Sequence, residues 1–196
     1  MFLLLARERK GKYNKRCTGV LLVQKSEDTP QWVKWVHEPA GIFHCLECLQ
    51  LDGCWFTWDN APLCPQHEKC HCRLEAIDYL IVQMNVSAYS DYSKFDPYLF
   101  DPNNFYKHGK NKAFESWGYS VDDAKWLQDE MERQAREKYI SGEYTLGKLN
   151  IFGQRINIVI EIPRKDGSGT VTFTSGWMIE PILIDYLCLI NICNFA

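Results

Sequence analysis

Six of the nine cysteines lie between Cys45 and Cys72, and this cluster constrains the fold more than any other feature of the sequence. The apolar stretch at residues 1–6 has no basic residue ahead of it, so it does not predict a secretory signal. In a reducing compartment, closely spaced cysteines serve more often as metal ligands than as disulfides. The sequence therefore predicts a cytoplasmic protein with a metal site in this part of the chain.

The spacing within the cluster is typical of a zinc site. Cys45 and Cys48 are separated by two residues, and a second group of donors follows after a loop of about fifteen residues. A tetrahedral zinc ion takes four sulfur or nitrogen ligands, and a closed site of this kind stabilises a module with a small apolar core. We therefore expect a structural Zn²⁺ ion. Its expected ligands are Cys45, Cys48, His67 and either Cys70 or Cys72.

Two other interpretations of the cluster stay open. The thiols can be unliganded and buried, as we expect for Cys54, which lies between Gly53 and Trp55. A catalytic zinc ion would need an open coordination position and a general base, for which Glu47 and Glu68 are the candidates. Because more donors are present than one ion uses, the closed structural site is favoured.

The composition excludes several classes of protein. Of the 196 residues, 46% are hydrophobic and 24% are charged, which is typical of a globular chain and not of a disordered or fibrous one. The formal net charge of -3 gives no overall attraction to nucleic acid, so RNA binding would need a local basic patch. The apolar residues 181–196 are too few to span a bilayer and include Asp185, so no membrane span is predicted.

Changes in composition divide the chain into four segments. Residues 1–36 are expected to form a basic N-terminal extension, and residues 37–80 a Cys/His-rich zinc-binding module. A linker is expected over residues 81–94, because residues 83–94 contain three serines and few aliphatic side chains. Residues 95–196 are expected to form a second domain.

The second domain has the pattern of an α+β fold. A short helix is expected over residues 110–117, and Ser120 with Asp123 forms a capping box for a longer amphipathic helix. From Gly153 the hydrophobic period changes to two, which predicts a strand, a turn at residues 165–169 and a return strand. Two helices packed on an antiparallel sheet define the α+β class. The positions expected to face the core are Val121, Ala124, Leu127, Met131 and Ala135 in the helix and Ile156, Ile158, Ile160 and Ile162 in the strand.

The cysteine-rich segment resembles the C-terminal metal knuckle of phage minor head (head morphogenesis) proteins of the Mu F-like group. The resemblance rests on Cys-Leu-Glu-Cys at residues 45–48, Leu-Asp-Gly at 51–53 and His-Glu-Lys-Cys-His-Cys at 67–72. In that family a tryptophan-rich strand precedes the first cysteine pair, and Trp32 and Trp35 fit it. The sequence departs from the family pattern at one usual proline and one usual arginine. The resemblance implies descent from a phage protein, with head or portal proteins as partners.

The second domain resembles an uncharacterised domain found at the C-termini of phage head proteins and bacterial polymorphic toxins. The resemblance rests on residues 101–103, 109–114, 117–119, 153–155 and 175–179. Such tails are often nucleases of the barnase, EndoU, colicin or RelE-like class. By this analogy of context and fold, the resemblance implies a metal-independent ribonuclease toxin, with RNA as substrate and a cognate immunity protein as partner.

Residues of this domain fit the chemistry of such a ribonuclease. A histidine with a pKa near neutrality, here His108, can move the proton of a 2′-hydroxyl or of the leaving oxygen, and cationic side chains stabilise the charge at phosphorus. A lysine-rich loop with one histidine is also typical of a solvated surface, and this alternative stays open. The expected catalytic residues are His108, Lys110, Lys112, Arg155, Thr174 and Ser175.

Three functions therefore follow as hypotheses. The chain is a ribonuclease toxin, a non-enzymatic head morphogenesis protein or adaptor, or a module that binds RNA or an immunity protein without turnover. The resemblances place it in the cytoplasm of a bacterial host or in a virion.

Overall fold

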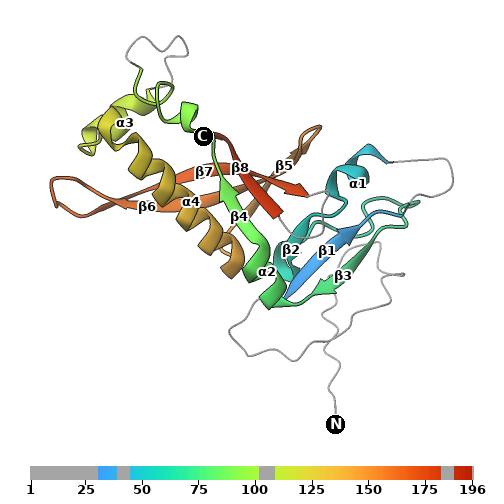
Figure 1. The fold of residues 1–196 in the computed structure, drawn as a ribbon. Coiled ribbons are helices and arrows are strands. Elements are labelled where there is room, and N and C mark those ends of the chain that lie inside the picture. Colours follow the sequence, from blue (N-terminus) through green and yellow to red (C-terminus); the bar gives the residue numbers. More distant parts are fainter. Residues whose placement is uncertain (1–30, 39–44, 102–108, 182–187, 196) are drawn as a thin grey trace.

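The computed structural model describes residues 31–38, 45–101, 109–181 and 188–195. A three-stranded sheet lies next to a five-stranded sheet, and a long helix crosses one face of the five-stranded sheet (Figure 1). The mixture of helices and largely antiparallel sheets confirms the α+β class. Within the described ranges, no helix combines the length and the apolar character needed to cross a membrane.

The three-stranded sheet is formed by the cysteine-rich part of the chain. Its central strand is β1 (Trp32–Val36), which pairs antiparallel with β2 (Trp55–Thr57) and β3 (Arg73–Ile77). Helix α1 (Leu46–Leu51) precedes β2, and the 3-10 turn η1 (Trp58–Asn60) follows it. From the sequence, residues 32–36 are expected in the N-terminal extension, whereas in the structure they form β1 at the centre of this sheet.

The five-stranded sheet has the order β4-β8-β7-β6-β5. Its neighbouring strands are antiparallel except for β4 and β8, which run parallel. β8 lies in the apolar segment 181–196, for which no strand is predicted from the sequence, and it pairs with both β4 and β7. The strands are β4 (Val86–Tyr89), β5 (Thr145–Asn150), β6 (Gly153–Pro163), β7 (Thr170–Pro181) and β8 (Cys188–Phe195).

The two predicted helices are present with bounds close to those expected. They are α3 (Lys110–Ser116) and α4 (Ala124–Ser141), and the 3-10 turn η3 (Val121–Asp123) joins directly onto α4. The carboxylate of Asp123 accepts a hydrogen bond from the backbone N–H of Ser120 at 2.9 Å, as a capping box requires. The predicted turn closes β6 and β7 into a hairpin.

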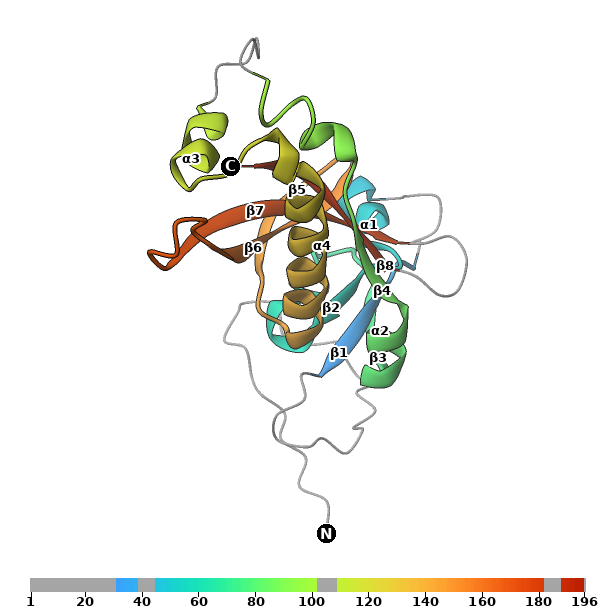
Figure 2. The ribbon, with the colours of Figure 1, turned by 60° about the vertical axis from the view of Figure 1, so that its left-hand side comes forward.

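The core lies between α4 and one face of the five-stranded sheet, across which α4 runs (Figure 2). The predicted apolar row of β6 is fully buried, and so are Leu127, Met131 and Ala135 of α4. Val121 is the exception among the predicted core positions, with 46% of its surface exposed. It belongs to η3, so the helical spacing that aligns the other residues does not extend to it.

The expected linker is built into the second domain. Residues 81–94 contain most of α2 (Tyr79–Asn85), all of β4 and the 3-10 turn η2 (Tyr92–Lys94). Ser90 is fully buried, and its N–H and hydroxyl donate to Glu132 of α4 at 2.7 and 2.5 Å. Small polar side chains resemble a linker in sequence, but here tertiary hydrogen bonds satisfy them.

The small sheet and the second domain share one continuous core. The ring of Trp32 packs edge-on against Tyr139 of α4 with 5.0 Å between ring centroids. The hydroxyl of Tyr144 accepts a hydrogen bond from the backbone N–H of Thr57 at 2.9 Å. The side chain of Asn60 donates to the carbonyl of Tyr144 at 3.1 Å. The cysteine-rich part is therefore packed onto the second domain.

Gly142 ends α4 at this contact. It adopts a left-handed conformation with φ of 83°, and a Cβ atom there would lie 3.0 Å from the methyl carbon of Thr57. Glycine thus allows both the helix end and the close approach of β2.

Tyr144→Phe is expected to lower the free energy of unfolding by about 1–3 kcal/mol, because it leaves the buried N–H of Thr57 without its acceptor. Urea denaturation followed by tryptophan fluorescence measures the change. Tyr89→Phe is the matched control, since Tyr89 is 54% exposed, and its effect should stay within about 0.5 kcal/mol. Equal effects of the two substitutions would show that this contact does not join the two parts.

Candidate metal centre

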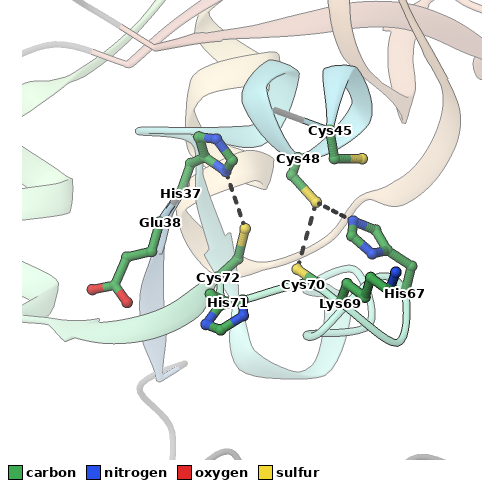
Figure 3. Close-up of a pocket in the computed structure, with 9 residues that line it drawn as sticks. All are labelled: His37, Glu38, Cys45, Cys48, His67, Lys69, Cys70, His71 and Cys72. Carbon is green, nitrogen blue, oxygen red and sulfur yellow. Dashed lines mark hydrogen bonds between the residues drawn. The ribbon is translucent and has the colours of Figure 1, made fainter. Parts of the chain in front are cut away.

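Cysteine and histidine side chains converge at one end of the three-stranded sheet (Figure 3). Helix α1 supplies Cys48 in its first turn, and Cys45 is the residue that caps this helix. The loop between η1 and β3 supplies His67, Cys70 and Cys72. The structure therefore brings together all five residues that the sequence predicts as zinc ligands.

The donor atoms form two overlapping groups. The ligand atoms of Cys45, Cys48 and His67 lie within 4.8 Å of one another, and so do those of Cys48, Cys70 and Cys72. Cys48 belongs to both groups, with its Sγ 3.6 Å from Nε2 of His67 and 3.5 Å from Sγ of Cys70. Ligand atoms of one tetrahedral zinc ion lie about 3.5–3.8 Å apart. These side chains are close enough to bind a metal ion.

His37 is a further donor that the sequence analysis does not identify. Its Nδ1 lies 3.3 Å from Sγ of Cys72, and its backbone N–H donates to the carboxylate of Asp52 at 2.9 Å. His37 directly follows β1, and the last residue pair of β1 and β3 is Val36 with Arg73. One step further along this register places His37 opposite Cys72. Only the pairing of β1 with β3, two strands distant in sequence, shows that His37 lies beside Cys72. The spacing of the cysteines and histidines along the chain does not show it.

Two cysteines of the cluster bond to backbone carbonyls. Sγ of Cys54 donates to the carbonyl of Gln50 at 3.7 Å, and Cys54 is fully buried, as expected for a packing residue. Sγ of Cys64 donates to the carbonyl of Cys72 at 3.1 Å. Neither thiol is among the side chains that line the pocket.

The local environment opposes free thiolates. Burial, together with the neighbouring thiol of Cys70, raises the pKa of Cys48 far above its ordinary value. Burial and Cys70 also raise the pKa of Cys72 to about 11. Burial acts on Cys70 in the same direction, but hydrogen bonds to the backbone and to the thiols of Cys72 and Cys48 together outweigh it, and the pKa of Cys70 is lowered. Several thiolates can coexist here only beside a cation, which a bound metal ion supplies.

The alternative of a catalytic metal ion needs a general base beside the site. Glu47 and Glu68 are both exposed, and neither is among the described residues that line the pocket. Glu38 does line it, but its carboxylate forms an ion pair with Arg73. The chemistry of the donor set fits a closed site better than an open one.

The described residues predicted for ribonuclease chemistry are not among those that line this cluster, and they lie in several places. His108 lies outside the described residues. Lys110 and Lys112 are in the first turn of α3, where burial lowers the pKa of Lys110. α3 packs its Phe114 ring against Phe173 of β7 at 5.3 Å, on the face of the sheet that also carries the buried row of β6.

The other predicted catalytic residues are divided between the two faces of the sheet. Arg155 and Thr174 share the outer face, but their strand pairs are four residues apart along β6, or roughly 13 Å. Ser175 lies on the buried face, where its hydroxyl donates to the carbonyl of Ile158 at 3.1 Å and accepts from the indole of Trp177 at 2.7 Å. The structure does not bring the described members of this set into one site.

The fold and the site define an α+β protein whose N-terminal part carries a cluster of Cys/His side chains close enough to bind a metal ion. A family model described as a domain of unknown function (DUF6883) matches residues 84–183, which are 100 of the 196 residues. The chain belongs to this family. No curated protein and no solved structure matches the chain. The matched range begins after Cys72, so the candidate metal ligands lie in the part of the chain that the family model does not cover.

Cys48→Ser is expected to weaken metal binding by more than the roughly 10–100-fold that loss of an outer-shell partner causes, because Cys48 belongs to both donor groups. The zinc bound per chain after dialysis against buffered zinc, measured by plasma mass spectrometry and compared with the unsubstituted protein, tests this. Cys54→Ser is the matched control, since Cys54 is equally buried but bonds to a carbonyl, and it should keep its metal. Full metal content in Cys48→Ser would refute the assignment.

Proposed function

We propose that this chain is a non-enzymatic structural protein or adaptor of the phage-head type, in which a zinc-bound module supports the DUF6883 domain. The observation that carries the proposal is the convergence of the cysteine and histidine donors at the end of a sheet that packs directly onto α4. Zinc is proposed because thiolate and imidazole ligands at this spacing suit that ion.

A structural role for the metal ion is supported by the small apolar core of the three-stranded sheet, which an ion could supplement. The three-stranded sheet is small, and its residues bury their apolar side chains partly against α4. A zinc ion held by residues from α1 and from the loop before β3 links the two segments that flank the end of β1. When bound, the ion supplies cross-linking and charge neutralisation, which are the usual contributions of a closed site.

The phage-head type is proposed from the resemblance at residues 45–48, 51–53 and 67–72. Head or portal proteins are the class of partner that it favours. The ribonuclease hypothesis stays a prediction, because the described members of its catalytic set are dispersed over two faces of the sheet.

Removal of the metal with EDTA is expected to lower the melting temperature of the full chain by roughly 10 °C, because a ligand at about a thousand times its Kd stabilises the native state by about 4 kcal/mol. Tryptophan fluorescence and far-ultraviolet circular dichroism should report one common transition, since the two parts share a core. Zinc should restore the melting temperature, and magnesium, which prefers oxygen ligands, should not. An unchanged melting temperature would rule out a structural ion.

The purified chain is expected not to cleave RNA, because Lys110 and Lys112 lie on the opposite side of the sheet from Arg155 and Thr174. Gel analysis of total RNA, incubated with excess protein, tests this. Cleavage that His108→Ala removes and that the control His71→Ala retains would overturn the non-enzymatic proposal in favour of the ribonuclease.

A further inference from the structure

We propose that the Cys/His cluster holds two zinc ions that share the thiolates of Cys48 and Cys70. This inference rests on the metal binding proposed above and specifies its composition. The remaining ligands are Cys45 and His67 for the first ion and Cys72 and His37 for the second.

The number of donors exceeds what one ion uses. With His37, six cysteine and histidine side chains contribute to the cluster. One tetrahedral zinc ion takes four ligands, and it would leave two of these side chains unused. Two ions that share two bridging thiolates need two further ligands each, which equals six side chains in total.

The arrangement of the sulfur and nitrogen atoms also indicates two positions. The donor atoms fall into two groups, and Cys48 is common to both. Two thiolates that bridge the same pair of ions must lie close together, and Sγ of Cys48 is 3.5 Å from Sγ of Cys70. Cys45 and His67 form one group with Cys48, and Cys70 and Cys72 form the other, so the sulfur of Cys70 has to shift toward Cys45 and His67 to bridge the two ions.

His37 gives the second position its fourth ligand. A nitrogen and a sulfur on one tetrahedral zinc ion lie about 3.6 Å apart, and Nδ1 of His37 is 3.3 Å from Sγ of Cys72. Figure 3 shows the His37 ring directed at Cys72, on the side of the cluster opposite His67. The antiparallel pairing of β1 with β3 holds these two residues opposite each other.

Charge balance favours two ions. Four cysteine thiolates carry four negative charges, two zinc ions carry four positive charges, and neutral imidazole rings add none. One ion with the same four thiolates would leave two negative charges uncompensated. Cys48 is fully buried and Cys72 is 7% exposed, so uncompensated charge there would be costly.

Native mass spectrometry of the full chain, purified under reducing conditions with zinc, tests the proposal. Two zinc ions per chain are expected. One ion per chain would overturn this inference and leave the proposed structural metal intact, whereas none would overturn both. Iron with acid-labile sulfide would also overturn it, because inorganic sulfide would then be the bridge.

Substitutions separate the two positions. His37→Ala and His67→Ala are each expected to reduce the content from two ions to one, and His71→Ala is the matched control, because His71 lines the pocket but is not assigned as a ligand. Circular dichroism confirms that each variant is folded. Unchanged zinc content in His37→Ala would remove His37 from the ligand set.

In the unsubstituted chain loaded with ¹¹³Cd, two resonances with mutual coupling are expected, and uncoupled resonances would exclude shared thiolates.

Discussion

The packing of α4 against β1 and β2 is the contact on which the rest of the structure depends. Tyr139 and Tyr144 contact Trp32 and Thr57, which lie at one end of the small sheet. The cysteine and histidine donors lie at the other end of the same strands, after Val36 and before Arg73. A sheet of three short strands is therefore packed against α4 at one end and carries the candidate metal ligands at the other. Neither end needs a large core of its own.

Local patterns in the sequence predict most of the second domain. The period of 3.6 locates α4, and the period of two locates β6, because both reflect which side chains face one core. The same reasoning fails at Ser90 and at β8 for a physical reason. Ser90 is buried through its bonds to Glu132, and β8 is a strand through its pairing with β4 and β7. Those partners are distant in the sequence, and no local pattern shows them.

The candidate site divides in the same way. Spacing alone predicts Cys45, Cys48 and the donors of the second cysteine group, because short loops keep such residues together. His37 is missed because strand pairing, not spacing, brings it to Cys72. The predicted catalytic residues show the reverse case, because the sequence suggests a set of residues that the fold does not bring together. Residue types that suit a reaction are easy to find in a sequence, but only the register of β6 and β7 shows that Arg155 and Thr174 lie four residues apart along the sheet.

The position of β8 bears on the order in which the protein can fold during synthesis. β4 pairs with no other strand of its sheet than β8, and the register joins Val86 to Cys188. While the ribosome is still translating the segment between them, β4 and one edge of β7 have backbone groups with no strand beside them. The residues from His37 to Cys72 emerge much earlier, so the small sheet and its candidate metal ligands can assemble before the large sheet closes. Exposed strand edges invite association between nascent chains, so the newly made protein is open to aggregation until β8 pairs with β4 and β7.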